Sequence, residues 1–184
     1  RGLFEDVARN IDPGGATGYR LEFRTGKTIG ANAFALPSGI IIVTDELVSL
    51  SESDDELAGI FAHEIAHVKN RHALRSILQS TGVFFLITLL SGDVTSITSF
   101  AAFLPTLLIE SGYSREFERE ADQAAASFLI AGDKGTVPFR KMLEKLDASQ
   151  PGALKLGVFS DHPETAKRIE HLKELQRSAG GGSR

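Results

Sequence analysis

The chain has 184 residues, enough for one domain with a substantial hydrophobic core. Its hydrophobic fraction of 42% and charged fraction of 24% are ordinary for a globular protein and exclude a disordered chain. A net charge of −4 without a basic cluster argues against a nucleic-acid partner, and the absence of cysteine excludes disulfides and thiolate metal sites.

The first part of the chain predicts one helix followed by a small sheet. Apolar residues recur at helical spacing over Leu3–Ile11. Alternating side chains over Tyr19–Phe23, a turn at Gly26 and an extended run over Thr28–Leu36 indicate a hairpin. Ile40–Val43 is a short apolar run that predicts a further strand.

Helices are predicted in most of the remaining chain. The longest begins at Ser53, where Ser and a Glu three residues later form a capping box, and continues to about Gln79. Others are expected over Arg115–Ile130, over Phe139–Leu146 and from Pro163 onward. Helices with one small sheet indicate an α+β fold.

The chain ends predict one domain within a longer protein. We expect a single domain over residues 1–178 and a flexible tail over 179–184, which is rich in glycine. The chain starts at Arg1, which suggests that it was cut from a longer sequence. Residues 83–109 contain two apolar runs too short to cross a bilayer as helices. They predict either a buried helical hairpin or a surface that contacts a membrane or hydrophobic client.

The sequence His63-Glu64-Ile65-Ala66-His67 has the pattern H-E-x-x-H. On a helix, residues four apart share one face, so both imidazoles can bind the same zinc ion while Glu64 acts as base toward a water. Helical periodicity also places Glu64 in the apolar stripe, where a charge is costly unless a metal uses it. His72 falls off the metal face of a continuous helix, so we expect it to be solvated or to cap the helix.

Zinc needs a third protein ligand, and the segment Ser114–Asp122 offers three glutamates. Glu118 and Asp122 lie on one edge of the buried stripe of their helix, whereas Glu116 and Glu120 lie on the other. This favours Glu118 as the ligand and Asp122 as the carboxylate that holds a ligating histidine. A solvated acidic face is the alternative.

Four segments together resemble the HtpX and CAAX-prenyl-protease family of zinc metallopeptidases. Two are H-E-I-A-H-V-K-N-R from His63 and S-R-E-F-E-R-E-A-D from Ser114. The others are N-A-F-A-L-P from Asn32, and Asp161-His162-Pro163 with Arg168. Ser38 replaces a glycine that is usual in this family.

The resemblance implies a mainly helical, gluzincin-like fold whose edge strand borders the active site. It places the metal ligand on Glu118 and the orienting carboxylate on Asp122. Asn32 and Ala33 would bind substrate through the sheet edge, and His162 and Arg168 would stabilise the oxyanion. Without the resemblance to this family, His162 would be interpreted as a helix N-cap residue. Some relatives place the equivalent of His162 on the zinc, which gives a latent enzyme.

The expected function is that of a zinc metalloendopeptidase with one zinc ion per chain and protein or peptide substrates. The chain resembles the soluble BepA-like branch, which implies the bacterial cell envelope, periplasmic or outer-membrane associated, and protein quality control there. A repeat domain outside this chain would fit that branch. The alternatives are a zinc-stabilised, chaperone-like binding module with little or latent proteolysis, and a zinc hydrolase that acts on a non-peptide bond.

Overall fold

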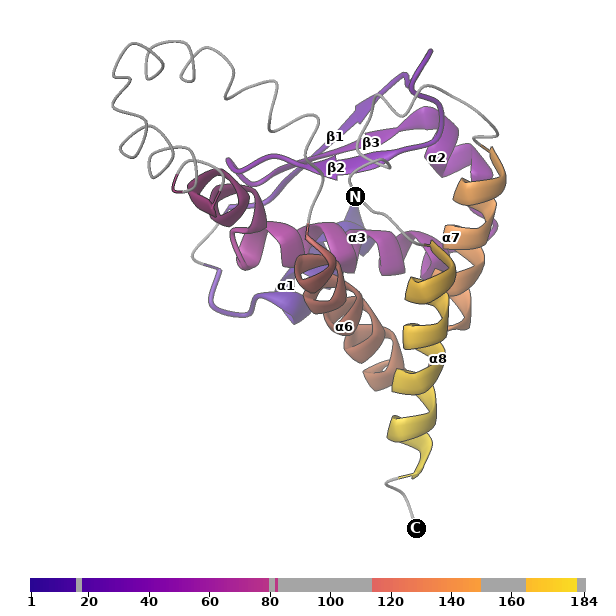
Figure 1. The fold of residues 1–184 in the computed structure, drawn as a ribbon. Helices are drawn as coiled ribbons and strands as arrows, with labels where there is room; N and C mark the ends of the chain where they lie inside the picture. The colour runs from indigo at the N-terminus through magenta and orange to yellow at the C-terminus, as the bar shows by residue number, and fades with distance from the viewer. Residues whose placement is uncertain (16–17, 80–81, 83–113, 150–164, 182–184) are drawn as a thin grey trace, which may run out of the picture.

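A computed structural model of the chain describes residues 1–15, 18–79, 82, 114–149 and 165–181. It confirms the α+β fold, in which a small sheet lies at one side of a group of helices (Figure 1). The sheet has three strands, β1 (Arg20–Arg24), β2 (Ala33–Ala35) and β3 (Ile40–Thr44). The helices follow the order α1 (Gly2–Ile11), α2 (Asp45–Leu50), α3 (Asp54–Lys69), α6 (Arg115–Ala131), α7 (Val137–Ser149) and α8 (Thr165–Gly181).

The predicted hairpin between the first two extended segments is wrong. The strand order is β1-β3-β2, with β1 parallel and β2 antiparallel to β3. The apolar strand β3 takes the centre, where Ile41 and Val43 are fully buried. The loop after β1 is instead fixed to α2, because the Glu46 carboxylate accepts hydrogen bonds from Gly26 N (2.7 Å) and Lys27 N (3.2 Å).

Helix α2 was not predicted. It begins directly after β3, where Thr44 Oγ1 accepts a hydrogen bond from Leu47 N (3.2 Å). Threonine followed by two acidic residues is a usual helix start, and this signal lies at the end of the predicted strand.

Helix α3 lies in the middle of the fold, in contact with α1, α6, α7 and strand β2 (Figure 1). It is buried almost all round from Glu56 to Val68, because sheet and helices cover it on different sides. At its start the Ser53 hydroxyl accepts from Glu56 N (3.3 Å), as the capping box predicts. The Glu56 carboxylate, however, bonds to Lys145 on α7 (2.8 and 3.0 Å) and to Glu52 N.

The long helix predicted to reach Gln79 is interrupted. Helix α3 ends at Lys69, Asn70 forms its C-cap, and Arg71 adopts a positive φ of 54°. A new helical segment then runs over 72–79. The chain therefore changes direction just after the second histidine of the motif, and this changes where His72 lies.

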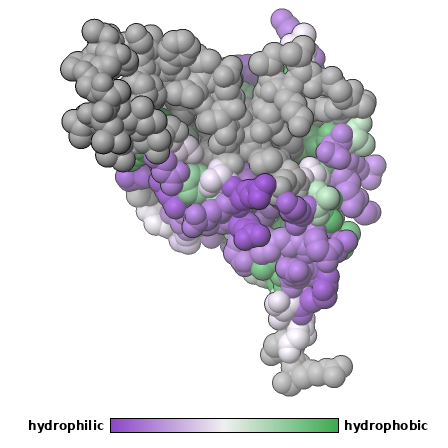
Figure 2. Space-filling model, viewed as in Figure 1, coloured by the Kyte–Doolittle hydropathy of each residue, from purple (hydrophilic) through white to green (hydrophobic). Residues whose placement is uncertain are grey.

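Helix α6 packs against α3 on the side away from the sheet, and α8 packs against α6 and α7 (Figure 1). Ser114 caps α6 by accepting from Phe117 N (3.3 Å), and the helix stops at Gly132 as predicted. The surface seen over α6 and α8 is mostly hydrophilic (Figure 2). Helix α8 continues to Gly181, three residues into the predicted tail.

Candidate metal centre

Helix α3 brings both motif histidines to one place in the core. His63, Glu64 and His67 are buried, and the two Nε2 atoms of the histidines lie 3.0 Å apart. Residues four apart on a helix share a face, which explains this convergence.

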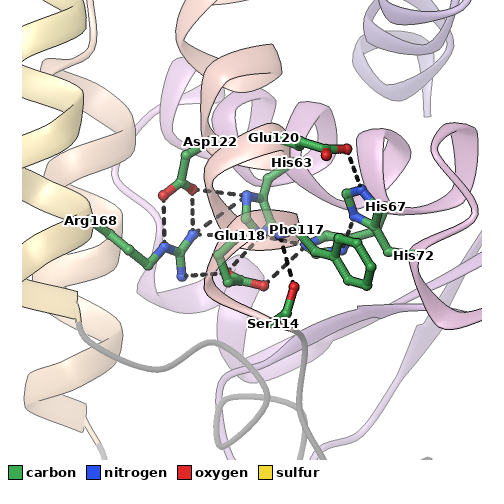
Figure 3. Close-up of polar contacts among 9 residues, drawn as sticks. All are labelled: His63, His67, His72, Ser114, Phe117, Glu118, Glu120, Asp122 and Arg168. Carbon is green, nitrogen blue, oxygen red and sulfur yellow. Dashed lines mark hydrogen bonds and ion pairs between the residues drawn. The ribbon is translucent and has the colours of Figure 1, made fainter. Parts of the chain in front are cut away.

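Helix α6 adds a carboxylate from the opposite side (Figure 3). Glu118 Oε1 lies 3.4 Å from His67 Nε2, and Glu118 Oε2 lies 3.6 Å from His63 Nε2. Glu118 is itself buried. In the part of the chain that the structure describes, these three residues are the group of His, Asp or Glu side chains that can hold a metal ion.

The separations among these atoms fit zinc. Bonds of about 2.0–2.2 Å in a tetrahedral site place the ligand atoms about 3.3–3.6 Å apart. The two histidine–carboxylate separations, 3.4 and 3.6 Å, lie in this range, and the separation between the two histidine nitrogens, 3.0 Å, is slightly shorter. Two imidazoles and one carboxylate are also the donor set that catalytic zinc sites use.

Asp122 lies one helical turn beyond Glu118 and holds the other nitrogen of His63. Its Oδ1 is 3.0 Å from His63 Nδ1, so the imidazole donates there and presents Nε2 to the metal position. Arg168 of α8 binds the same carboxylate twice, with Nε to Oδ2 at 2.9 Å and Nη2 to Oδ1 at 2.6 Å (Figure 3). Burial opposes ionisation, but the Arg168 charge and the His63 hydrogen bond lower the pKa of Asp122 well below its usual value.

The charges buried here favour a divalent cation. Three carboxylates, from Glu64, Glu118 and Asp122, are buried with one guanidinium, that of Arg168. Burial lowers the pKa of His63, and Arg168 lowers it further, so that this imidazole is neutral. With all three carboxylates ionised and both histidines neutral, the group would carry a formal charge of −2, which is costly in a protein interior without a cation.

The prediction that His72 is solvated is wrong. The turn at Asn70 and Arg71 brings its ring back beside His67, where it is fully buried. His72 Nδ1 lies 2.9 Å from His67 Nδ1, and its Nε2 lies 3.0 Å from Glu120 Oε2. Burial lowers the pKa of His72, although the hydrogen bond to Glu120 opposes this.

Two further residues complete this second network. Arg75 Nη1 lies 3.1 Å from the same Glu120 oxygen. Phe117 stacks on the His72 ring, with centroids 4.5 Å apart and planes inclined by 6°. A continuous helix would not bring these residues together, and Asn70, a frequent helix C-cap residue, is the sequence signal that could have indicated the turn.

Arg168 lies in the group, but its guanidinium is directed at carboxylates. Besides Asp122, its Nη1 is 3.4 Å from Glu118 Oε2. This arrangement suits a residue that supports the ligands, and the predicted contact with an oxyanion stays a prediction. His162 lies outside the described residues, as do Pro163 and the apolar segment 83–109.

Strand β2 lies at one border of the described sheet, but Asn32 is not available as expected. Asn32 N donates to Thr44 Oγ1 (2.8 Å), and Asn32 O accepts from Thr44 N (2.9 Å). Its main chain is thus paired toward β3 and its side chain is buried, so the substrate contact of Asn32 stays a prediction. Because strand residues alternate, the main-chain groups of Ala33 and Ala35 turn away from β3.

A cavity of about 320 Å³ lies between the end of β2 and the helical segment 72–79. Its wall includes Leu36, Pro37, Val68 and Leu74, together with His67. A larger cavity of about 620 Å³ lies among α1, α3 and α6 and has none of the clustered residues in its wall. Of these two cavities, the smaller one adjoins the candidate metal position, because His67 is part of its wall.

No helix among the described residues is both long and apolar enough to cross a membrane.

Comparisons with known proteins point to one family. The sequence model of Peptidase family M48 matches residues 3–176. Mitochondrial metalloendopeptidase OMA1 of Schizosaccharomyces pombe is 26% identical over 169 residues, which cover 91% of this chain and 50% of that protein. The Protease HtpX homolog of Salinibacter ruber is 28% identical over 190 residues, covering 83% of this chain and 63% of the relative. Metalloprotease LoiP of Escherichia coli is 28% identical over 153 residues, with coverages of 81% and 60%. The chain thus spans between 50% and 63% of the length of these relatives.

Proposed function

Because this chain belongs to Peptidase family M48, we propose that it is a zinc metalloendopeptidase domain that hydrolyses peptide bonds of protein substrates. The observation that carries the proposal is the convergence of His63, His67 and Glu118, with Glu64 on the same helix as the histidines. Relatives named as metalloendopeptidase and metalloprotease support it.

His63 and His67 would hold the zinc through Nε2, and Glu118 through its carboxylate. Zinc, when bound, supplies Lewis acidity, which makes a water molecule acidic enough to react at neutral pH and polarises the peptide carbonyl. The chain contributes the orientation of the ligands, because Asp122 and Arg168 hold His63 in place.

Glu64 would act as the general base. Its carboxylate is buried on the helix that carries both histidines, where it can accept a proton from the attacking water. It would then donate that proton to the nitrogen of the leaving amine. A purely structural zinc site needs no such carboxylate, so Glu64 favours an enzyme over a zinc-stabilised binding module.

The substrate would lie along strand β2 and reach the cavity beside His67. Main-chain groups of Ala33 and Ala35 turn away from β3 and can pair with an extended peptide. The apolar wall formed by Leu36, Pro37 and Leu74 suits an apolar substrate side chain. His162 remains the proposed group for the oxyanion.

We also propose that the domain works in a bacterial cell envelope, in protein quality control. The basis is its resemblance to the soluble periplasmic branch of the family. Detection of the native protein in periplasmic or outer-membrane fractions would support this location, and recovery in the cytoplasm alone would contradict it.

The test of the catalytic proposal is the substitution Glu64→Gln, which keeps the shape of the side chain and removes the base. Zinc content should persist while cleavage of casein disappears. Glu116→Gln, at an exposed position of α6, is the matched control and should retain cleavage. Undiminished cleavage by zinc-loaded Glu64→Gln would refute the assignment. A zinc-loaded wild-type domain that prevents aggregation but cleaves nothing would favour the chaperone-like alternative.

A further inference from the structure

We propose that His72 is a positioning residue for the metal centre, which fixes the proton and the orientation of the His67 imidazole. This inference rests on the proposed function, since it assumes that His67 binds a metal. His72 lies five residues after His67, and the turn at Asn70 and Arg71 places the two rings 4.8 Å apart at an interplanar angle of 81°.

The hydrogen-bond chain determines where each proton lies. The Glu120 carboxylate can only accept, so His72 Nε2, at 3.0 Å, donates to it. A neutral His72 with its proton on Nε2 has a lone pair on Nδ1. That lone pair accepts from His67 Nδ1 across 2.9 Å. His67 then carries its proton on Nδ1 and directs the lone pair of Nε2 at the metal position.

The position of His67 Nε2 agrees with this series of hydrogen bonds. It lies 3.0 Å from His63 Nε2 and 3.4 Å from Glu118 Oε1, as a shared cation requires. The opposite tautomer of His67 would place a proton there and prevent metal binding.

The surroundings hold His72 in this orientation. Arg75 fixes the Glu120 carboxylate at 3.1 Å and lies over the Phe117 ring, 4.3 Å from its centroid. Phe117 stacks on His72 and directly precedes Glu118, so the network also links two ligand-bearing elements.

Both histidines of the motif thus have an arginine–carboxylate pair behind them, Arg168 with Asp122 and Arg75 with Glu120. Figure 3 shows the two carboxylates. For His63 the carboxylate of Asp122 bonds directly to Nδ1, and Arg168 holds it. For His67 the carboxylate acts through the inserted ring of His72. Helix periodicity predicted an exposed His72, but the residue is buried beside the candidate metal ligands.

Two substitutions separate positioning from simple packing. His72→Phe keeps an aromatic ring against Phe117 and removes the acceptor. His72→Asn loses ring volume but keeps an amide oxygen near the position of Nδ1. If His72 positions His67, Phe weakens zinc affinity by about 10–100-fold, as loss of a ligand's hydrogen-bond partner does, and Asn restores most of it. If His72 only fills space, His72→Asn lowers the zinc affinity more than His72→Phe does.

Zinc affinity is measured by competition with a chromophoric chelator, and the Co²⁺ absorption spectrum reports the ligand geometry. Thermal unfolding of each metal-free variant shows whether it folds. Should His72→Phe fail to fold, Glu120→Ala tests the same series of hydrogen bonds, because Glu120 is its half-exposed end. Glu120→Ala should also weaken zinc binding, whereas Glu116→Ala should not.

Unchanged zinc affinity in His72→Phe, or equal losses in the Phe and Asn variants, would overturn the inference. Glu118→Ala is measured in parallel. If it weakens zinc binding and His72→Phe does not, the positioning role alone fails. If Glu118→Ala also has no effect, the proposed metal centre itself is wrong.

Discussion

Replacing Arg168 with methionine tests how the buried charges of the site are balanced. The substitution keeps much of the side-chain volume but removes the guanidinium that bonds to both oxygens of Asp122 (2.9 and 2.6 Å). Asp122 is only 1% exposed and Arg168 only 7%, so water cannot take over the lost interaction. The metal-free variant would retain the buried carboxylates of Asp122, Glu118 and Glu64 without a cation.

The expected loss of stability follows from this burial. Removing one partner of a buried ion pair costs about 3–5 kcal/mol, because the other charge stays uncompensated. For a domain of this size about 2–4 °C of Tm corresponds to each kcal/mol, so the Tm should fall by about 6–20 °C. The double variant Arg168→Met with Asp122→Asn should be more stable than Arg168→Met alone, since it has no uncompensated charge at this position.

Circular dichroism of the metal-free proteins during heating provides the measurement. The matched control is Arg177→Met on the same helix, because Arg177 pairs with Glu170 on the exposed surface (2.8 Å) and should change Tm little. The pKa of Asp122 is lowered in the native domain, so its pairing stabilises the fold at neutral pH and this contribution declines in acid. The difference in Tm between Arg168→Met and the wild type should therefore become smaller as the pH falls. A Tm of Arg168→Met equal to that of the wild type would refute the reasoning.

Other consequences concern packing, a second, partly buried ion pair and the metal. Gly59→Ala should destabilise the domain by about 1–3 kcal/mol in denaturant unfolding, because a Cβ at this position would lie 2.8 Å from Phe139 Cβ. An unchanged free energy of unfolding would contradict the close crossing of α3 and α7. Burial opposes ionisation of Glu56, but Lys145 lowers its pKa, so the pair should stabilise the fold above about pH 4.5 and less below it. The variant Lys145→Met should lose this pH dependence of stability, and an unchanged profile would count against the pairing. Chelation should lower the Tm of the wild type, because zinc at about 1,000 times its Kd adds about 4 kcal/mol; equal Tm values with and without zinc would argue against a folded-state site.

Local signals in the sequence predicted the helices that carry the site. The H-E-x-x-H spacing and the edge of the buried stripe on the later helix singled out His63, His67 and Glu118, and the structure brings these residues together. The resemblance to the HtpX family is confirmed by the match to Peptidase family M48. The first result depends on short-range periodicity and the second on short sequence motifs, and a sequence displays both directly.

Long-range pairing and the direction of the chain after a turn could not be predicted in the same way. The order β1-β3-β2 depends on which strand takes the centre of the sheet, and segments that are neighbours in sequence indicated a hairpin instead. A helix that continued past Arg71 would place His72 off the metal face, but the positive φ of Arg71 turns the chain there. The main chain of Asn32 was expected at the open edge, although its pairing with Thr44 depends on the register of β2 against β3.

Zinc binding by purified domains with Glu118→Ala and Glu116→Ala tests the central claim most directly. Both substitutions remove a glutamate from the first turn of α6, but Glu118 is buried beside the histidines whereas Glu116 is exposed. We predict one zinc ion per chain in the wild type and in Glu116→Ala, with affinity lowered at least about tenfold in Glu118→Ala. Equal zinc affinity in all three proteins, or no zinc in the wild type, would contradict a metal centre made of these three side chains.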